Sequence, residues 1–380
     1  MKKKTITNIF LVLLIGSVYS EKLKIVPMEE FNIPIAIGGD INKELNGNVQ
    51  YNVSYSIYDF KKKAGGGGST TKKEDVTEQI SSILKGKASS IGETREEREL
   101  KSSKPSLIGI EKINILSEEQ ASYGILNIIN LYFINAKVND RGIFAICKGK
   151  AEDILKLKVK GYPSSADYME GMIQNATSYN FLSKGYNLLN IYVELDSEGR
   201  NLVLPYLEVK DKNIIFTGMA LFKGNKMAYV LPMEDSKIMN MLREKKGKGI
   251  LSLQQSPDKY ISYDTMVKRK VKCNKIKGKY EFSIELDFQG DIVNNTLFKD
   301  INKENEKQFE ELMAKKIEKM CNNFLEKMKN IYKIDCLNLG MVAAAKYGRD
   351  TGVDWNEEVI NSDIRVSIKV KIDKLGIGQY

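Results

Sequence analysis

The chain has 380 residues, enough for two or three compact domains, and its 42% apolar and 28% charged residues are typical of a globular protein rather than a disordered one. The formal net charge is +10, but the lysines are scattered and arginines do not cluster among aromatic residues, so a nucleic-acid partner is not expected. The remaining interpretation of the positive charge is a weak attraction to an anionic membrane surface.

The first 20 residues have the pattern of an export signal. Three lysines precede an apolar stretch at 9–15, and Val18 and Ser20 suit cleavage after residue 20. Residues 14–17 read Leu-Ile-Gly-Ser, which matches a lipoprotein signal except that Ser17 replaces the cysteine that would take the lipid. A serine cannot form the thioether. Either the protein is released, or the uncut signal serves as a weak anchor, or Ser17 replaces a cysteine that the natural protein has at this position.

Residues 33–60 predict a β-hairpin with Asn46-Gly47 at its turn, because the second run alternates apolar residues with a period of two. The glycines in 61–74 predict a flexible loop, and the spacing of a phosphate-binding loop is missing there. Residues 75–100 are expected to be helical. A buried strand is predicted within 102–116, and Ser117 then caps a helix, with Gln120 at the position of a capping box.

The middle of the chain alternates short strands and helices. A strand is predicted over 142–149 and a short helix opens at Lys150. Residues 164–200 read as helical or mixed and end in a strand at 189–195. The pattern changes near 197–200, and a hairpin is then expected over 214–232, with its turn at 223–226 and a short helix after it at 235–243.

Two long strands and a long helix dominate the last part. The strands, over 267–273 and 280–288, place lysines and acids on one solvent face. Residues 303–334 carry apolar side chains at every third or fourth position. This stripe is either a partner-binding face or, as is more usual, the side of a helix that packs on a sheet. A final strand is expected over 363–372.

These elements predict an α+β fold class with two to three domains, each a mixed or antiparallel sheet packed by helices. The predicted division is 1–20 as signal peptide, 21–200 as an N-terminal region, and 201–380 as a C-terminal domain with the long amphipathic helix and the final strand. The N-terminal region divides into two α+β domains if the chain has three domains.

The residues that commonly carry catalysis are scarce. The chain has no histidine, which excludes Ser-His-Asp and Cys-His catalysis and removes the commonest transition-metal ligand. No CxxC pair occurs among the four cysteines, so no metal site and no cofactor are expected. Buried free thiols are the expectation for them. A Cys321–Cys336 bridge is the most plausible disulfide if the chain is exported.

Several stretches share their order and spacing with a known family. They are AIGGDI at 36–41, Lys104-Pro105 through INILSEEQASYGI at 113–125, GKAEDIL at 149–155, TGMALFKGNKMAYVL at 217–231, and Asp335, Gly340 and Trp355 with VSIKVKIDKLG at 366–376. Together they resemble the Ger(x)C family, the C-subunit lipoproteins of nutrient germinant receptors in endospore-forming bacteria. The resemblance covers about residues 30–376. Members usually begin the mature chain with Cys followed by Trp-Asp, where this chain has Ser17-Val18-Tyr19.

The resemblance implies a non-enzymatic receptor subunit built from three α+β domains. It implies a location on the outer face of the spore inner membrane, with a receptor A subunit and a transporter-like B subunit as partners. Membrane association through those partners is expected even though Ser17 lacks the lipid. The resemblance brings no catalytic or ligand-binding residue.

Residue-level expectations are few. Trp355, the only tryptophan, is a candidate partner contact or else a plug of the C-terminal core. Gly218, Phe222 and Lys226 in the predicted hairpin come next and are expected to be structural.

Two other functions are open. One is an exported solute-binding protein that holds a small ligand between domains, which would need convergent polar groups in a concave site. The other is an exported hydrolase that uses Asp354, Glu357 and Glu358 beside Trp355. These acids are expected to be loop and helix-start residues, because paired acids need a cleft and a raised pKa to act as catalysts.

Overall fold

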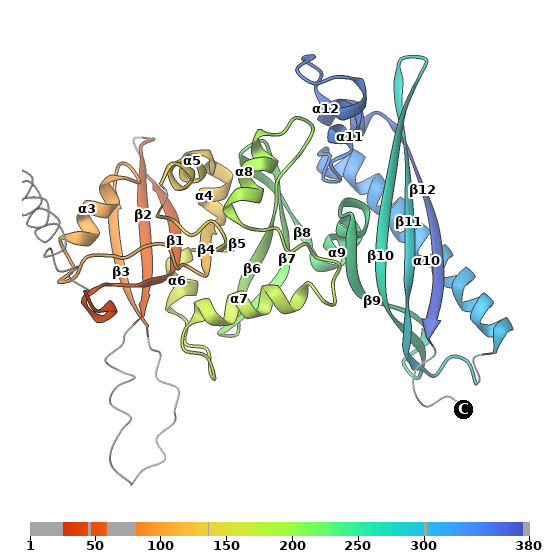
Figure 1. Ribbon diagram of the computed structural model, residues 1–380, viewed down its shortest axis with the longest axis horizontal. Coiled ribbons are helices and arrows are strands. Elements are labelled where there is room, and N and C mark those ends of the chain that lie inside the picture. Colours follow the sequence, from red (N-terminus) through yellow and green to blue (C-terminus); the bar gives the residue numbers. More distant parts are fainter. Residues whose placement is uncertain (1–25, 45–46, 59–80, 136, 300–301, 375–380) are drawn as a thin grey trace, which may run out of the picture.

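The computed structural model describes residues 26–44, 47–58, 81–135, 137–299 and 302–374, and it consists of two sheets with helices packed on them (Figure 1). One sheet has the strand order β3-β2-β1-β4-β5-β6-β7-β8, and the other has the order β12-β11-β10-β9. Both combine parallel and antiparallel pairs. The predicted α+β class is confirmed. Among the described residues, no helix is long and apolar enough to cross a membrane.

The predicted N-terminal hairpin is present. After a short 3₁₀ turn at Met28–Glu30, β1 (Pro34–Lys43) pairs antiparallel with β2 (Val49–Tyr58). Asn46 and the 61–74 loop lie outside the described residues, as do Ser17 and the signal peptide.

The helix predicted over 75–100 is wrong for most of its described length. Residues Ser81–Ala88 form strand β3, which pairs with β2, and only α3 (Glu93–Glu99) is helical. Tertiary pairing decides here, because the free edge of β2 offers backbone groups that a strand satisfies. Gly86 also brings β3 close to α3, since a Cβ there would lie 2.1 Å from the Thr94 carbonyl oxygen.

A parallel layer follows. β4 (Ile113–Ser117) lies beside β1, and β5 (Ile143–Cys147) lies beside β4. α4 (Glu118–Tyr123) and α5 (Leu126–Ile134) connect them, and α6 (Ala151–Lys156) follows β5. The cap at Ser117 is confirmed, since its hydroxyl accepts the Gln120 N–H at 3.1 Å. The Gln120 side chain donates to the Gly124 carbonyl, so the second half of a capping box is not made there.

Two of the stretches singled out in the sequence meet at the start of α6. Asp40, from AIGGDI on β1, accepts the N–H groups of Ala151 (2.7 Å) and Glu152 (3.1 Å) from GKAEDIL. An aspartate from a distant strand thus caps this helix, where a carboxylate satisfies free N–H groups. Gly38 lets the helix approach, because a Cβ there would lie 2.9 Å from the Leu155 side chain.

The strand predicted at 189–195 is wrong. After α7 (Ser165–Ala176), the segment forms helix α8 (Leu188–Asp196). The Asn187 side chain caps it by accepting the Asn190 N–H at 3.0 Å. Leu188 and Ile191 are buried while Leu189 and Val193 are exposed, so the burial follows a helical period rather than a period of two.

The first sheet continues past residue 200. β6 (Val203–Lys210) joins β5 in parallel, and β7 (Asn213–Lys223) and β8 (Lys226–Pro232) form the predicted hairpin. α9 (Met233–Arg243) then leads to the second sheet. The division of domains at residue 200 stays a prediction. In Figure 1, α4, α5 and α8 lie along the upper part of the first sheet and α7 along its lower part.

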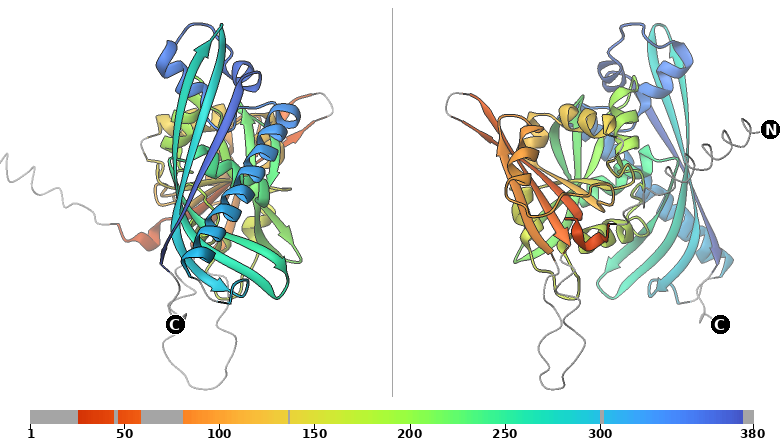
Figure 2. Two further views of the ribbon diagram at one scale, coloured as in Figure 1. Left: turned by 90° about the vertical axis from the view of Figure 1, so that its right-hand side faces the viewer. Right: turned by 60° about the vertical axis from the view of Figure 1, so that its left-hand side comes forward.

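The second sheet has β9 (Lys246–Ser256), β10 (Lys259–Ile276), β11 (Lys279–Asn295) and β12 (Asp363–Lys374). The long helix α10 (Lys303–Lys327) runs diagonally along these strands (Figure 2) and continues as a π-helical turn at Met328–Tyr332. Its apolar stripe packs on the sheet, since Phe309, Met313 and Ile317 are fully buried. The core-packing interpretation of the stripe is confirmed.

Two short helices, α11 (Leu339–Tyr347) and α12 (Trp355–Ile360), precede β12. All four cysteines are buried free thiols, as expected, so the Cys321–Cys336 bridge is not formed.

Candidate functional site: the buried junction

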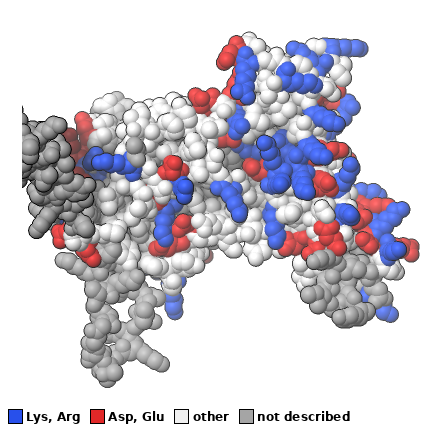
Figure 3. Space-filling view, viewed as in Figure 1, with Lys and Arg blue, Asp and Glu red and all other residues white. Residues whose placement is uncertain are grey.

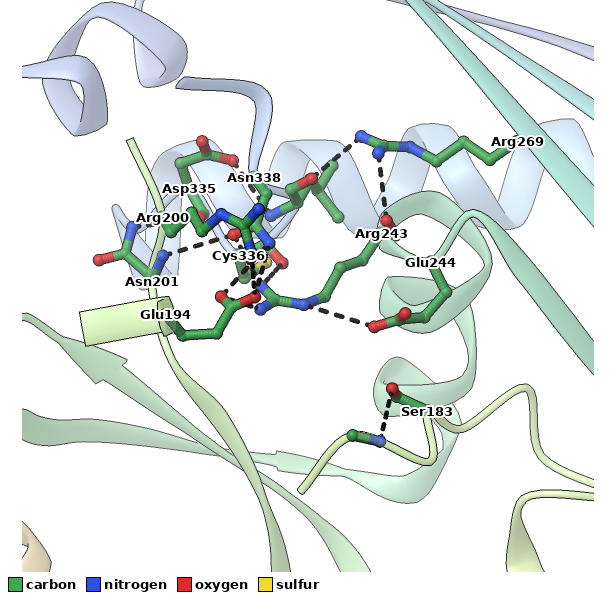
Figure 4. Close-up of polar contacts among 12 residues, drawn as sticks. Ser183, Glu194, Arg200, Asn201, Arg243, Glu244, Arg269, Asp335, Cys336 and Asn338 are labelled. Carbon is green, nitrogen blue, oxygen red and sulfur yellow. Dashed lines mark hydrogen bonds and ion pairs between the residues drawn. The ribbon is translucent and has the colours of Figure 1, made fainter. Parts of the chain in front are cut away.

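A cluster of buried charged and polar side chains lies where the first sheet meets the second (Figure 4). Its members come from the end of α8 and the loop after it, the end of α9, strand β10, and the segment between α10 and α11. We call this cluster the junction; its residues are Glu194, Arg200, Asn201, Arg243, Glu244, Arg269, Asp335, Cys336 and Asn338.

An ion pair between Glu194 and Arg243 is its centre. The Glu194 Oε2 accepts the Arg243 Nη2–H at 2.7 Å, and its Oε1 accepts an N–H of Arg200 at 3.0 Å. The Arg243 side chain is 7% exposed and that of Glu194 is 18% exposed. A carboxylate partner lowers the cost of a guanidinium at this depth, because an unpaired buried charge is costly. Glu194 supplies it from across the boundary between the sheets.

The guanidinium of Arg243 also bonds the segment between α10 and α11. Its Nη1 donates to the Cys336 carbonyl at 2.9 Å and to the Asn338 Oδ1 at 3.1 Å. Asn338 has a left-handed backbone with φ of 56°, which asparagine tolerates better than most residues. One arginine thereby fixes the turn that starts α11.

Arg269 enters from β10 at an inward position of the strand. Its Nη1 donates to the Arg243 carbonyl at 3.1 Å and its Nη2 to the Leu337 carbonyl at 3.0 Å. Burial, together with the charge of Arg243, lowers the pKa of Arg269 to about 10 despite the opposing carboxylates Asp335 and Glu244. Arg269 remains charged at neutral pH and is held by backbone oxygens.

Asp335 is fully buried and organises the loop around it. Its Oδ2 accepts the Gly340 N–H at 2.7 Å and its Oδ1 accepts the Leu337 N–H at 3.1 Å. Burial raises the pKa of Asp335, although these N–H groups and Arg243 oppose the rise. Its own N–H donates to the Asn356 Oδ1 at 2.7 Å. The Asp335 carboxylate therefore has a structural role, because both of its oxygens accept backbone N–H groups of the loop.

Trp355 lies beside the junction and is 4% exposed. Its indole N–H donates to the Glu198 Oε1 at 2.6 Å, and its ring meets Tyr280 edge-on at 5.3 Å between centroids. Gly340 and Gly199 allow the close approach, since a Cβ on Gly340 would lie 2.8 Å from the Trp355 Cβ. This position agrees with the core-packing alternative for Trp355. A role as partner contact stays a prediction.

The acids proposed for a hydrolase sit at the start of α12. Asp354 Oδ1 accepts the N–H groups of Asn356 (3.0 Å) and Glu357 (3.1 Å), which is an N-cap. Glu357 and Glu358 are exposed on the first turn. The expectation that they are helix-start residues is confirmed.

The three hairpin residues lie apart from the junction. Gly218 sits where β7 bulges against β6, and a Cβ there would lie 1.8 Å from the Leu231 carbonyl oxygen. Phe222 is fully buried in β7, and Lys226 is an exposed residue opposite Lys223 at the turn. Gly218 and Phe222 serve packing. None of the hydrogen bonds described for the junction involves these three residues.

The sequence did not single out Glu194, Arg243 or Arg269. Glu194 fell in a segment that was expected to be a strand, and the contacts of Arg243 come from positions far along the chain. Arg269 carried a signal, because it alternates inward with Val267 and Val271 on β10. An arginine at an inward strand position implies a buried partner.

The junction has no nucleophile among its described residues. Burial and the charge of Asp335 raise the pKa of the Cys336 thiol, so the thiolate is disfavoured. What the arrangement can do is hold two sheets in one relative orientation. Turning one against the other requires separating charges that are buried when paired.

Two family models match the chain in succession, and their boundary falls within the first sheet, where β6 ends and the hairpin of β7 and β8 begins. A family model described as "Spore germination protein N-terminal domain" matches residues 24–209, and one described as "Spore germination B3/ GerAC like, C-terminal" matches residues 217–376. The spore germination protein GerQC of Bacillus cereus is 24% identical over 283 residues, which are 73% of this chain and 78% of that protein.

A solved structure has the same fold. The crystal structure of the GerBC protein matches with a TM-score of 0.53 and 14% identity, over 90% of this chain and 99% of that one. The family models leave unmatched only the ends of the chain and residues 210–216 between them. The chain therefore belongs to the family of GerAC-like spore germination proteins.

Proposed function

We propose that the chain is the C subunit of a spore nutrient germinant receptor, needed for germination in response to nutrients. The proposal places it outside the cell, on the outer face of the spore inner membrane, with the receptor A and B subunits as partners. The observation that carries it is the match of two germination-protein models, in order, over residues 24–209 and 217–376.

The proposed role is non-enzymatic. The junction supports it, because the carboxylates of Glu194 and Asp335 accept hydrogen bonds from guanidinium and backbone N–H groups. A subunit that connects other proteins needs fixed orientation between its parts rather than a reactive group. The junction supplies such an orientation between the two sheets.

A basic face on the second sheet supports a position beside an anionic membrane. Lysines and arginines gather over this part of the molecule (Figure 3). The strand register places on one solvent face Lys268, Lys270, Lys272, Arg365, Lys369 and Lys371. Glu281, Glu285, Asp287 and Asp363 share that face, so these four acids offset most of the six cations and leave a small positive excess. Each cation near an anionic surface contributes about 1 kcal/mol of attraction.

The test is germination of spores that lack this chain. The spores are given a panel of nutrients, and dipicolinate release is followed beside spores complemented with the gene. Loss of the response to one nutrient class, restored by the gene, is the expected result. An unchanged response to every nutrient in spores without any other germinant receptor would contradict the proposal. It would favour the exported solute-binding protein instead.

A further inference from the structure

A cavity of about 290 Å³ lies in the first sheet unit, far from the junction in sequence. Strands β1 and β2, helix α3, the segment before β4 and helix α5 enclose it. Its apolar wall consists of Ile37, Val53, Ile91, Ile108, Leu131 and Val138. The volume is close to the lower limit of small-molecule sites in proteins, which are mostly apolar with a few placed polar groups.

One buried cation lines this cavity. Arg98 is 3% exposed, and its guanidinium lies over the Tyr55 ring at 4.1 Å from the centroid. Its Nη1 donates to the Thr94 hydroxyl at 2.9 Å and its Nη2 to the Tyr55 hydroxyl at 3.1 Å. Within the described part of the chain, no carboxylate lies within ion-pair distance of it. The hydrogen-bond partners of this guanidinium are neutral, so no described carboxylate neutralises its charge, and an anion in the cavity would do so.

Two polar atoms at the cavity have no hydrogen-bond partner among the described residues. The Arg98 Nε and the Ser106 Oγ are both buried and both unpaired. Buried polar atoms are usually paired in native proteins, so these two are available to bond a ligand or a water in the cavity. Tyr132 also lines the cavity, and burial raises the pKa of its hydroxyl, which therefore stays a neutral donor.

The charge around the cavity favours an anion. Arg95 and Arg98 contribute two positive charges, and Glu99 is the one acid among the residues that line it. Arg95 is exposed and Arg98 is buried, so the positive charge extends from the rim to the floor. A guanidinium binds a carboxylate with charge-assisted hydrogen bonds, which are stronger than neutral ones. The apolar walls favour a ligand whose remaining atoms are hydrocarbon.

We propose that this cavity binds a small monocarboxylate with a branched or aromatic apolar body. The carboxylate lies at the Arg98 Nε and the hydroxyls of Ser106 and Tyr132, and the hydrocarbon body lies against the aliphatic wall. This site is independent of the proposed receptor role, because its ligand is assigned from the lining alone.

The first experiment is calorimetric titration of the full chain with 4-methylpentanoate and with its neutral analogue 4-methylpentanamide. The two probes have nearly the same shape, so the difference isolates the charge. The expected result is that the carboxylate binds about tenfold tighter or more, since hydrogen bonds to charged groups are the stronger class. Equal binding of the amide, or no binding of either probe at about 10 mM, would overturn the proposal.

The second experiment uses variants of the lining. Arg98→Met should remove the preference for the carboxylate while Arg365→Met, at an arginine exposed on the second sheet, should keep it. If Arg98→Met does not fold, Ile108→Trp decides, because a larger side chain on the loop before β4 fills the cavity and should abolish binding of both probes. Undiminished binding in a folded Ile108→Trp variant would place the ligand elsewhere and refute this site.

Discussion

Glu194 and Arg243 show how a single ion pair can join two sheets. Glu194 lies on α8 and Arg243 at the end of α9, and both contact a third segment at Asn338, where Arg243 also bonds Cys336. Taking Glu194 away leaves the buried Arg243 with only the more distant Glu244 carboxylate, 3.6 Å away, and this loss costs more than the pair itself contributes. The sensitivity of the junction to substitution is therefore expected to exceed that of the surface ion pairs.

Glu194→Gln tests this at constant shape. We expect it to lower the free energy of unfolding by about 3 kcal/mol, because Arg243 keeps its charge in a site that is nearly closed to water. Urea denaturation followed by circular dichroism measures the change. The control is Asp363→Asn, which removes the exposed pair with Arg365 and should leave the urea midpoint unchanged. Equal effects of the two substitutions would contradict a special role of the buried pair.

Glu152 is a single residue whose ionisation is expected to make the stability of the fold depend on pH in the acidic range. Burial alone would raise its pKa, but hydrogen bonds from Lys156, Lys85 and Asn52 outweigh burial and lower the pKa to about 2. A carboxyl whose folded pKa is depressed stabilises the fold above its unfolded pKa of about 4.5, and this contribution is lost as the pH falls toward 2.

The difference in unfolding free energy between the wild type and Glu152→Gln should therefore be constant above pH about 5 and shrink between pH about 4.5 and about 2. Urea unfolding of both proteins at a series of pH values measures it. A difference that stays constant down to the lowest pH would show that the three donors do not hold the ionised form.

Some of these residues could be anticipated from the sequence and others could not. Arg269 was visible as an inward charge in an alternating strand, and Asp354 was visible as a helix start. Glu194, Arg243 and the cavity residue Arg98 were not visible, because each lies on a helix whose partner faces come from distant parts of the chain. Periodicity reports which face is buried but not what it is buried against.

Glycines decide how closely elements pack in this fold. Gly218 in β7 leaves no room for a Cβ beside the Leu231 carbonyl of β8, whereas Gly171 on the exposed side of α7 has nothing within 4 Å. Replacing glycine by alanine is therefore expected to have opposite effects on stability at these two positions.

Gly218→Ala should destabilise the protein by about 3 kcal/mol, since backbone must move to admit the methyl group. Gly171→Ala should stabilise it by about 0.5 to 1 kcal/mol, because alanine loses less conformational freedom in a helix. Thermal or urea unfolding compares the three proteins. A loss of stability at residue 171 as large as that at 218 would refute the steric explanation.

The errors at the element scale have one physical origin. Residues 81–88 became a strand because β2 offered a free edge, and residues 188–196 became a helix because their buried positions recur every third or fourth residue. Short apolar segments fit both periods, so tertiary partners decide between them. Long elements such as α10, β10 and β11 were predictable, because many residues repeat the same pattern.

The two sheets are expected to unfold together as long as the junction is intact. The segment after α8 docks on the start of α11, where the Gly199 carbonyl accepts the Met341 N–H at 2.8 Å. Gly199 has φ of 72°, and a Cβ there would lie 2.3 Å from the Gly340 carbonyl carbon. A methyl group at Gly199 would therefore disturb the contact between the two sheets at the backbone.

Gly199→Ala should separate two transitions that coincide in the wild type. Trp355 fluorescence reports the junction, and far-UV circular dichroism reports both sheets, so the fluorescence midpoint should fall below the dichroism midpoint in the variant. Gly92→Ala, at a residue with φ of −60° and open space around it, should keep the two midpoints together. Separate midpoints in the wild type, or coincident ones in Gly199→Ala, would contradict coupling through the junction.

The last strand carries a consequence for how the protein is made. β12 pairs in parallel with β11, joining Glu281 to Asp363 and so on along both strands, with α10, α11 and α12 lying between them in the chain. Such a pairing closes a long loop and must form late. Until it forms, β11 exposes a free backbone edge that can pair with another chain. Synthesis that stalls before residue 363 would leave an aggregation-prone intermediate with the edge of β11 exposed. Pairing of the final strand is therefore the step that completes maturation.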